Sequence, residues 1–158
     1  MKKPAIAIRS LQNRIFFAGE RRKAGAVNSL DIKNLVFKTL SLRPLNWSGQ
    51  ISILLVGDKM IRDLNFKYLD KNRPTDVLAF DLSRGKGDIT CEIVVSTDAA
   101  FYNSRIYKTS PVYETYLYVV HGLLHILGFD DRAEIERKFM QKKAEKILFD
   151  FNPLNSKL

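Results

Sequence analysis

The chain has 158 residues, of which 46% are hydrophobic and 27% charged, with a net charge of +9. These values are typical of one soluble globular domain, here residues 1–158, and exclude a mostly disordered chain. A single cysteine excludes an intramolecular disulfide, and no apolar run reaches the ~18 residues of a membrane span. We therefore expect a cytoplasmic protein with no membrane partner and no disulfide-linked partner.

The N-terminal segment, residues 1–25, carries most of the net positive charge, +6 of the +9. It holds one acidic residue, Glu20, against seven basic ones: Lys2, Lys3, Arg9, Arg14, Arg21, Arg22 and Lys23. Such an excess attracts polyanions and speeds encounter with them. A solvated basic face without a nucleic-acid partner explains the charge equally well. Residues 5–8 indicate a short strand, whereas the rest of the segment supports no structural prediction.

Helix and strand patterns alternate through the first half of the chain. Apolar residues at helical spacing predict a helix from residue 29 to residue 40, capped by Ser29 or Asp31. Pro44 and Asn46 then mark a turn. Residues 50–56 (QISILLV) predict a strand, and residues 59–68 predict a helix that ends before Pro74.

The second half begins with two predicted strands, residues 75–82 and 89–96, joined by a turn. Three helices follow, at residues 97–107, 111–127 and 132–149. Ile135, Phe139 and Ile147 are expected to face the core from the last helix, and residues 151–158 are expected to form a flexible tail. These elements predict an α/β (α+β) domain with a mixed sheet of about four strands and about five helices.

The two histidines of the chain, His121 and His125, stand four residues apart in the long predicted helix. Four helical residues advance ~400° and ~6 Å, so the two imidazoles share one helix face. That arrangement lets two ring nitrogens bind one metal ion at ~2.0–2.1 Å. The structural alternative is a pair of packed or hydrogen-bonded core histidines.

A third ligand requires the helix to end soon after His125. A left-handed glycine at Gly128 ends a helix and turns the chain back, which brings Asp130 and Asp131 toward the same ion. Asp131 and Glu134 also resemble a helix-capping pair, although Asp130 is able to supply that cap instead. We expect Asp131 to be the third metal ligand.

At these positions the sequence resembles the YbeY family of bacterial rRNA maturation endoribonucleases, whose signature is H-G-x-L-H-L-x-G-[YF]-D-H. The chain matches this signature at His121, Gly122, Leu124, His125, Gly128, Phe129 and Asp130. Leu64-Asn65 with Tyr68, residues 74–80 (PTDVLAF) and residues 92–96 (EIVVS) resemble further blocks of the family. The likeness covers roughly residues 50–150 and implies a mixed sheet with the metal-binding helix packed across it.

Three positions depart from the family pattern: Asp131 replaces a histidine, Leu69 an arginine and Ala79 a serine. A carboxylate in place of an imidazole lowers the net charge of the site. The bound water is then acidified less, and harder divalent ions compete better with zinc. Because Leu69 cannot pair with a phosphate, Arg73 becomes the favoured RNA-binding residue, with Lys71 and Lys67 beside it. A merely solvated basic loop is the alternative.

The resemblance implies a zinc-dependent single-strand endoribonuclease of rRNA maturation and ribosome quality control, with rRNA and the ribosome as partners. One zinc ion on His121, His125 and Asp131 would activate water for attack on phosphorus. The sequence identifies no general base, so the catalytic residues are unknown. One alternative is a ribosome assembly factor with a structural metal and little nuclease activity. A metallopeptidase is disfavoured because Gly122 stands where such enzymes carry their catalytic glutamate.

Overall fold

The structure is a computed structural model that describes residues 15–19, 22–43 and 48–151. The strand expected at residues 5–8 and the turn at Pro44 and Asn46 lie outside these residues. Most of the expected flexible tail also lies outside them. Its first residue, Phe151, is the last residue of a helix, and its ring contacts that of Tyr116 edge-on at 6.4 Å between centroids.

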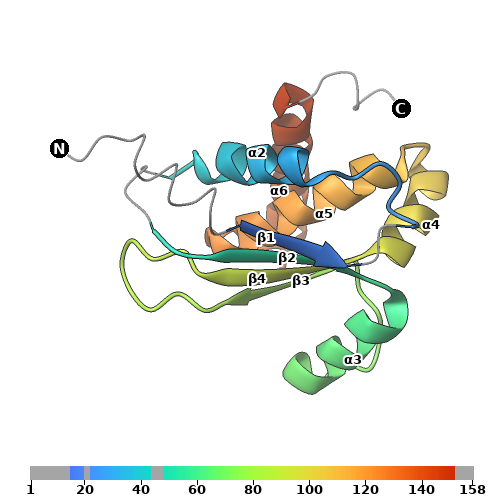
Figure 1. The fold of residues 1–158 in the computed structure, drawn as a ribbon, viewed down its shortest axis with the longest axis horizontal. Helices are drawn as coiled ribbons and strands as arrows, with labels where there is room; N and C mark the ends of the chain where they lie inside the picture. Colours follow the sequence, from blue (N-terminus) through green and yellow to red (C-terminus); the bar gives the residue numbers. More distant parts are fainter. Residues whose placement is uncertain (1–14, 20–21, 44–47, 152–158) are drawn as a thin grey trace.

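Four strands form one mixed sheet in the order β1-β2-β4-β3 (Figure 1). They are β1 (Ile15–Gly19), β2 (Ile51–Val56), β3 (Val77–Asp81) and β4 (Cys91–Ser96). β1, β2 and β4 run parallel, and β3 runs antiparallel to β4 at one edge. β1 falls within the basic segment for which the sequence supported no structural prediction.

Five helices are present in the described part of the chain. They are α2 (Ser29–Leu40), α3 (Asp58–Leu69), α4 (Thr97–Tyr107), α5 (Pro111–Ile126) and α6 (Glu134–Phe151). The expected mixed α/β fold is therefore confirmed. The expected cap of the first of these helices is wrong, because Asn28 is the N-cap and its side chain accepts a hydrogen bond from the backbone N–H of Asp31 at 2.8 Å.

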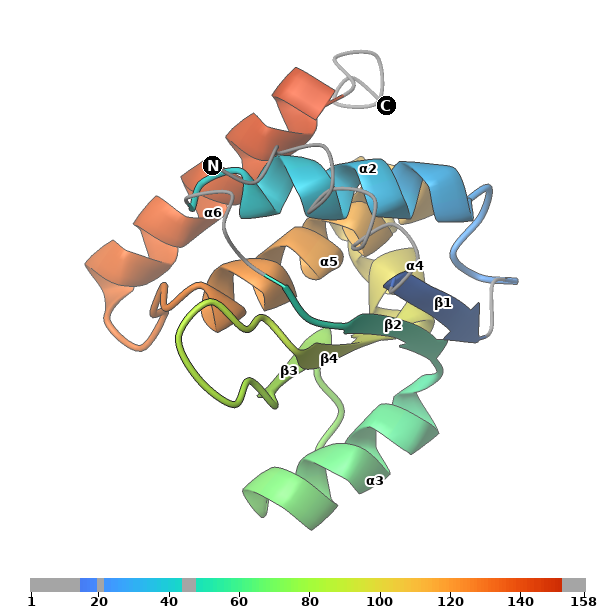
Figure 2. The same ribbon diagram turned by 60° about the vertical axis from the view of Figure 1, so that its left-hand side comes forward.

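Helix α5 lies across one face of the sheet and is enclosed by α2, α4 and α6, whereas α3 covers the opposite face (Figures 1 and 2). Its apolar residues are buried on nearly every side, so it forms the centre of the main core. A second, smaller cluster lies under α3, where Ile61 packs with Val56, Leu78 and Val94. The expected placement of the histidine-bearing helix across the sheet is confirmed.

Gly122 allows α5 to approach the sheet closely. A Cβ atom at this position would lie 2.7 Å from Cγ2 of Ile93 and 3.2 Å from Cγ2 of Val77. Position 122 therefore faces the sheet. Residues 121 and 125 lie about 100° and 60° around the helix from it, both in the same direction, so their side chains project to one side of this contact.

Helix α6 packs through Met140, Ala144, Ile147 and Leu148, so the expectation for Ile147 is confirmed. The expectations for Ile135 and Phe139 are wrong, because these side chains are 83% and 57% exposed. Phe139 lies about 100° around the helix from Met140 and stacks instead on Phe129, with 6.3 Å between ring centroids. None of the helices in the described ranges is long and apolar enough to span a bilayer.

Candidate active site

The C-terminal turn of α5 determines where the chain goes after the histidines. Gly128 has φ = +94°, and its N–H donates to the carbonyl of His125 at 3.0 Å. The N–H of Phe129 donates to the carbonyl of Leu124 at 3.0 Å, which completes a Schellman motif. The guanidinium of Arg43 also donates to the carbonyl of Leu127. The left-handed bend expected at Gly128 is therefore confirmed.

The bend brings Asp131 back to His125. Oδ2 of Asp131 lies 3.4 Å from Nε2 of His125, and both side chains are partly exposed to solvent. The two groups meet across a six-residue separation that a continuous helix would not allow, since residue 131 would then lie about 9 Å further along the axis. The structure therefore places one imidazole and one carboxylate side by side.

Asp130, and not Asp131, makes the hydrogen bonds to the backbone that precedes α6. Its carboxylate accepts hydrogen bonds from the backbone N–H groups of Asp131 at 2.7 Å and Arg132 at 3.1 Å. The Arg132 side chain also donates to it, and these bonds hold the pKa of Asp130 at about 2. At the start of α6, the Glu136 carboxylate accepts from the N–H of Ala133 at 3.4 Å. The Asp131 carboxylate is thus not used as a helix cap.

His121 has quite different surroundings. Its Nε2 atom is buried and has no hydrogen-bond partner among the described residues. Burial lowers the pKa of its imidazole, and the neighbouring Asp76 opposes this effect only in part. A neutral imidazole with an unused ring nitrogen is the form that binds a metal ion.

The side chains of His121, His125 and Asp131 are of the chemical types that bind a divalent ion, since imidazoles and carboxylates are common zinc ligands. The buried, unpartnered Nε2 of His121 supports this fit. Within the described ranges, no three His, Cys, Asp or Glu side chains are gathered closely enough to hold an ion. The structure brings together His125 and Asp131 but does not bring His121 into the same group.

His125 and Asp131 open into a hollow of about 480 Å³ between α5, the end of α3 and β3. We call it the basic hollow, and its lining residues are Asn65, Leu69, Lys71, Arg73, Pro74, Thr75, Val77, Leu78, Ala79, His125 and Asp131. Two of the three expected RNA-binding residues, Lys71 and Arg73, therefore share a hollow with two of the expected metal ligands. Lys67 does not line it, and its ammonium group lies 5.1 Å from the ring centroid of Tyr68.

Asn65 positions the loop that carries Arg73. Its side chain is almost fully buried, and Nδ2 donates to the carbonyl oxygen of Arg73 at 2.8 Å. The sequence placed Asn65 in a family-like block but gave it no role. The only sequence feature that could have indicated a role for Asn65 is a polar residue at a helix position that faces the core.

His121 opens into a second hollow, of about 470 Å³, between α4, α5 and α6. We call it the acidic hollow because it contains three carboxylates, those of Asp76, Glu114 and Glu145. Glu114 is buried and accepts a hydrogen bond from the hydroxyl of Thr109. Sequence reasoning missed these carboxylates as neighbours of His121, because they come from three separate segments.

The chain is similar to known proteins over nearly its whole length. Residues 20–152 match the family model described as Endoribonuclease YbeY. The endoribonuclease YbeY of Carboxydothermus hydrogenoformans is 39% identical over 111 residues, which are 70% of this chain and 78% of the relative. That of Syntrophomonas wolfei is 31% identical over 148 residues, which are 87% of this chain and 90% of the relative.

A solved structure has the same fold. The solution structure of TM1509 from Thermotoga maritima superimposes with a TM-score of 0.58 and 27% sequence identity, covering 91% of this chain and 95% of that one. The family match confirms the expected class of enzyme, a hydrolase that cuts RNA in rRNA processing. This chain belongs to the YbeY family of endoribonucleases.

Proposed function

We propose that this cytoplasmic protein cuts single-stranded rRNA at the basic hollow, in rRNA maturation and ribosome quality control. We further propose that it uses one zinc ion held by His121, His125 and Asp131. The observation that carries the proposal is the approach of Asp131 to His125, at 3.4 Å, inside a hollow that also contains Lys71 and Arg73. A metal-ligand pair and phosphate-binding cations in one hollow are what phosphodiester hydrolysis requires.

When bound, the zinc ion supplies an activated water and polarises a phosphoryl oxygen. The residues of the chain do the rest. Lys71 and Arg73 pair with phosphates of the RNA backbone, and Asn65 keeps the Arg73 backbone in place through the 2.8 Å hydrogen bond. The low pKa of His121 keeps its ring nitrogen unprotonated at neutral pH, ready to act as a ligand.

The Asp131 carboxylate affects the choice of metal. It gives the site one more negative charge than a third imidazole would, so manganese or another harder divalent ion competes better with zinc. Asp131→His is therefore expected to keep the ion and to shift the preference toward zinc. Competition between zinc and manganese, followed by elemental analysis of the purified protein, measures this preference.

A metallopeptidase is disfavoured by packing as well as by sequence. Such enzymes place a catalytic glutamate directly after the first histidine. Here position 122 faces the sheet, and even a Cβ atom there would lie 2.7 Å from Ile93. Position 122 therefore has no room for a glutamate side chain, and a side chain there would point at the sheet and not toward a bound substrate.

A ribosome assembly factor with a structural metal is the second candidate. Leu69, Ala79 and Asp131, the three departures from the family pattern, all line the basic hollow. A hollow changed at three positions supports RNA binding with reduced cleavage. The ribosome and rRNA remain its partners under this alternative.

Cleavage of a defined rRNA fragment decides between the two candidates. We expect purified protein to cut the fragment, and chelator or the His125→Ala substitution to abolish cutting without abolishing binding. Lys38→Ala, a charge change on α2 away from the hollow, is the matched control and should cut normally. Binding without cleavage by the zinc-loaded protein would favour the assembly factor. Cleavage that survives both chelator and His125→Ala would contradict the proposal.

A further inference from the structure

The outer face of α4 is unusually apolar for an exposed surface. Tyr102, Ile106 and Tyr107 are 57%, 68% and 67% exposed, and they lie within two turns of one helix. Exposed apolar side chains that gather in this way mark a binding surface more often than scattered ones do. Tyr107 also lines the acidic hollow, so the face borders the hollow into which His121 opens. None of its residues lines the basic hollow.

The same face is positively charged. The Arg105 guanidinium lies over the ring of Phe101, 4.3 Å from its centroid, and Lys108 follows at the C-cap of the helix. The one carboxylate of α4, that of Asp98, is paired with Lys23 and accepts from the N–H of Asp58 at 2.7 Å. The face thus presents cations to solvent while its acidic residue is neutralised.

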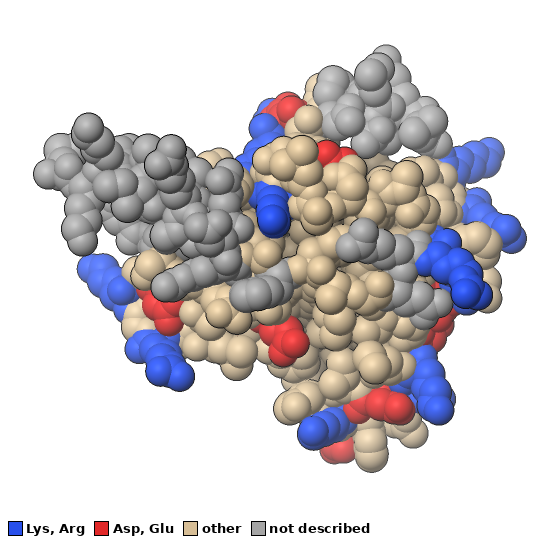
Figure 3. Space-filling view, in the orientation of Figure 1, with Lys and Arg blue, Asp and Glu red and all other residues tan. Residues whose placement is uncertain are grey.

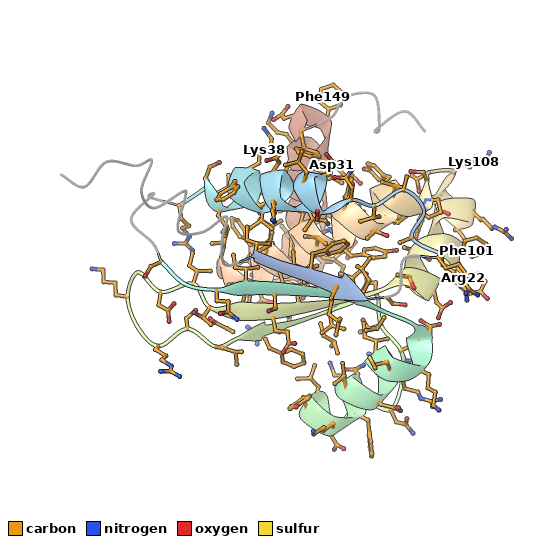
Figure 4. All side chains as sticks on the ribbon, in the orientation of Figure 1. Arg22, Asp31, Lys38, Phe101, Lys108 and Phe149 are labelled. Carbon is orange, nitrogen blue, oxygen red and sulfur yellow. The ribbon has the colours of Figure 1, made fainter. Side chains whose placement is uncertain are left out.

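Arg22 extends this positive charge beyond the helix. The ion pair between Lys23 and Asp98 attaches its segment to the first turn of α4. In the view of Figure 4, Arg22, Phe101 and Lys108 lie along the same margin of the molecule, and Figure 3 shows basic side chains along this margin. Aromatic rings interleaved with arginine and lysine are the pattern of surfaces that bind single-stranded nucleic acid.

We propose that this α4 surface, formed by Arg22, Phe101, Tyr102, Arg105, Ile106 and Lys108, is a second RNA-binding surface that holds a single strand by base stacking. Tyr102 offers a ring to one base. The Arg105 guanidinium, already stacked on Phe101, offers its other face to a base or pairs with a phosphate. The proposal rests on the proposed function, because it takes the bound strand to be the RNA that is cut.

The position of the surface defines its role in the reaction. α4 leads into the N-terminus of α5, whereas His125 lies in the last turn of α5 and Asp131 follows shortly after that helix ends. Because α5 has 16 residues, it is ~24 Å long and separates the two regions by about that distance. The carboxylates of the acidic hollow lie between the two and disfavour phosphates there. The surface therefore binds RNA at a distance from the cut, so it strengthens the binding of long fragments and leaves short oligonucleotides unaffected.

A double substitution tests the surface. Tyr102→Ser with Arg105→Ser removes one exposed ring and one cation from side chains that are not buried, so the fold is retained. The matched control, Lys38→Ser with Phe149→Ser, also removes one aromatic ring and one positive charge, but from α2 and α6, away from α4 (Figure 4). Binding of a labelled single-stranded rRNA fragment is measured by fluorescence anisotropy in chelator, and circular dichroism melting checks the fold of each variant.

We expect the Kd of the α4 variant to rise about tenfold, which is what the loss of one base stack predicts, while the control changes less than twofold. The slope of log Kd against log salt should also decrease by about 1. Equal affinity of both variants and wild type overturns the proposal. An equal loss of affinity for single-stranded and duplex RNA also overturns it, because only the cation would then matter.

Two further outcomes separate this proposal from the proposed function. Normal cleavage of a short oligonucleotide by the α4 variant, with a raised KM for the long fragment only, supports both. Tight RNA binding that depends on α4, without any cleavage, would support the α4 surface and contradict the proposed endoribonuclease mechanism. If RNA affinity is unchanged and the variant loses a wild-type dimer in analytical ultracentrifugation, the face binds a second copy of the chain and the proposal fails.

Discussion

The two histidines of α5 have opposite surroundings. His125 lies beside Asp131 in a hollow that also contains Lys71 and Arg73, whereas His121 lies in a hollow with three carboxylates. Phosphates are attracted to the first hollow and repelled from the second. Two histidines on one helix face therefore differ in their chemistry, and under the proposed function we expect RNA to approach from the His125 side.

Helix α5 carries both histidines and lies close to the sheet at Gly122, so Gly122→Ala should have the largest effect of the substitutions, on stability. The added Cβ would lie 2.7 Å from Ile93, and such overpacking costs ~1–3 kcal/mol. Alanine regains up to ~1 kcal/mol of helix propensity, so the net loss should be at the lower end of that range or slightly below. Chemical denaturation measures the free energy of unfolding.

Gly85→Ala is the matched control for this substitution. A Cβ atom at Gly85 would have no heavy atom within 4 Å, so its stability should stay at the wild-type value. Equal stability of the Gly122→Ala variant and the control would show that the helix is able to move away from the sheet at no cost.

The contrast in charge predicts a smaller effect on RNA binding. Arg73→Ser removes a cation from the basic hollow, so affinity should fall a few-fold for every RNA sequence and the salt slope should decrease by about 1. Lys67→Ser removes the same charge from a residue that does not line the hollow. Fluorescence anisotropy over a series of salt concentrations compares the two, and equal losses would mean that general charge, and not the hollow, holds the RNA.

The contrast in burial predicts the smallest effect, on the pH dependence of stability. Because burial lowers the pKa of His121, the unfolded chain binds a proton more readily than the folded one. Stability is then fully present above the unfolded pKa of about 6.5 and decreases as the pH falls below it. This decrease should be weaker in the His121→Gln variant and retained in His125→Gln. Urea unfolding of chelator-treated protein at several pH values measures it.

Local patterns in the sequence predicted most of the fold. Branched apolar runs predicted β2 and β4, and the apolar spacing of residues 111–127 predicted α5 to within one residue. The glycine bend was predictable because Gly128 follows a continuous apolar helix and needs a positive φ. Asn28, Ser29 and Asp31 are all good caps, so local propensity did not distinguish among them.

What the sequence did not predict depends on contacts between distant segments. Ile135 and Phe139 are apolar but lie off the stripe of α6 that meets the core, and only the packing angle of that helix determines this. The basic hollow joins residues 65–79 to residues 125–131, and the acidic hollow joins α4, α5 and α6. The different surroundings of the two histidines were therefore not predictable from their spacing.

The metal content of three purified proteins tests the central claim most directly. If His121, His125 and Asp131 hold one ion, wild-type protein loaded with zinc and passed over a desalting column should retain about one ion per chain. The His125→Ala variant should retain almost none, and Asp131→Asn should retain clearly less than the wild type. Full zinc occupancy in all three proteins would contradict the account.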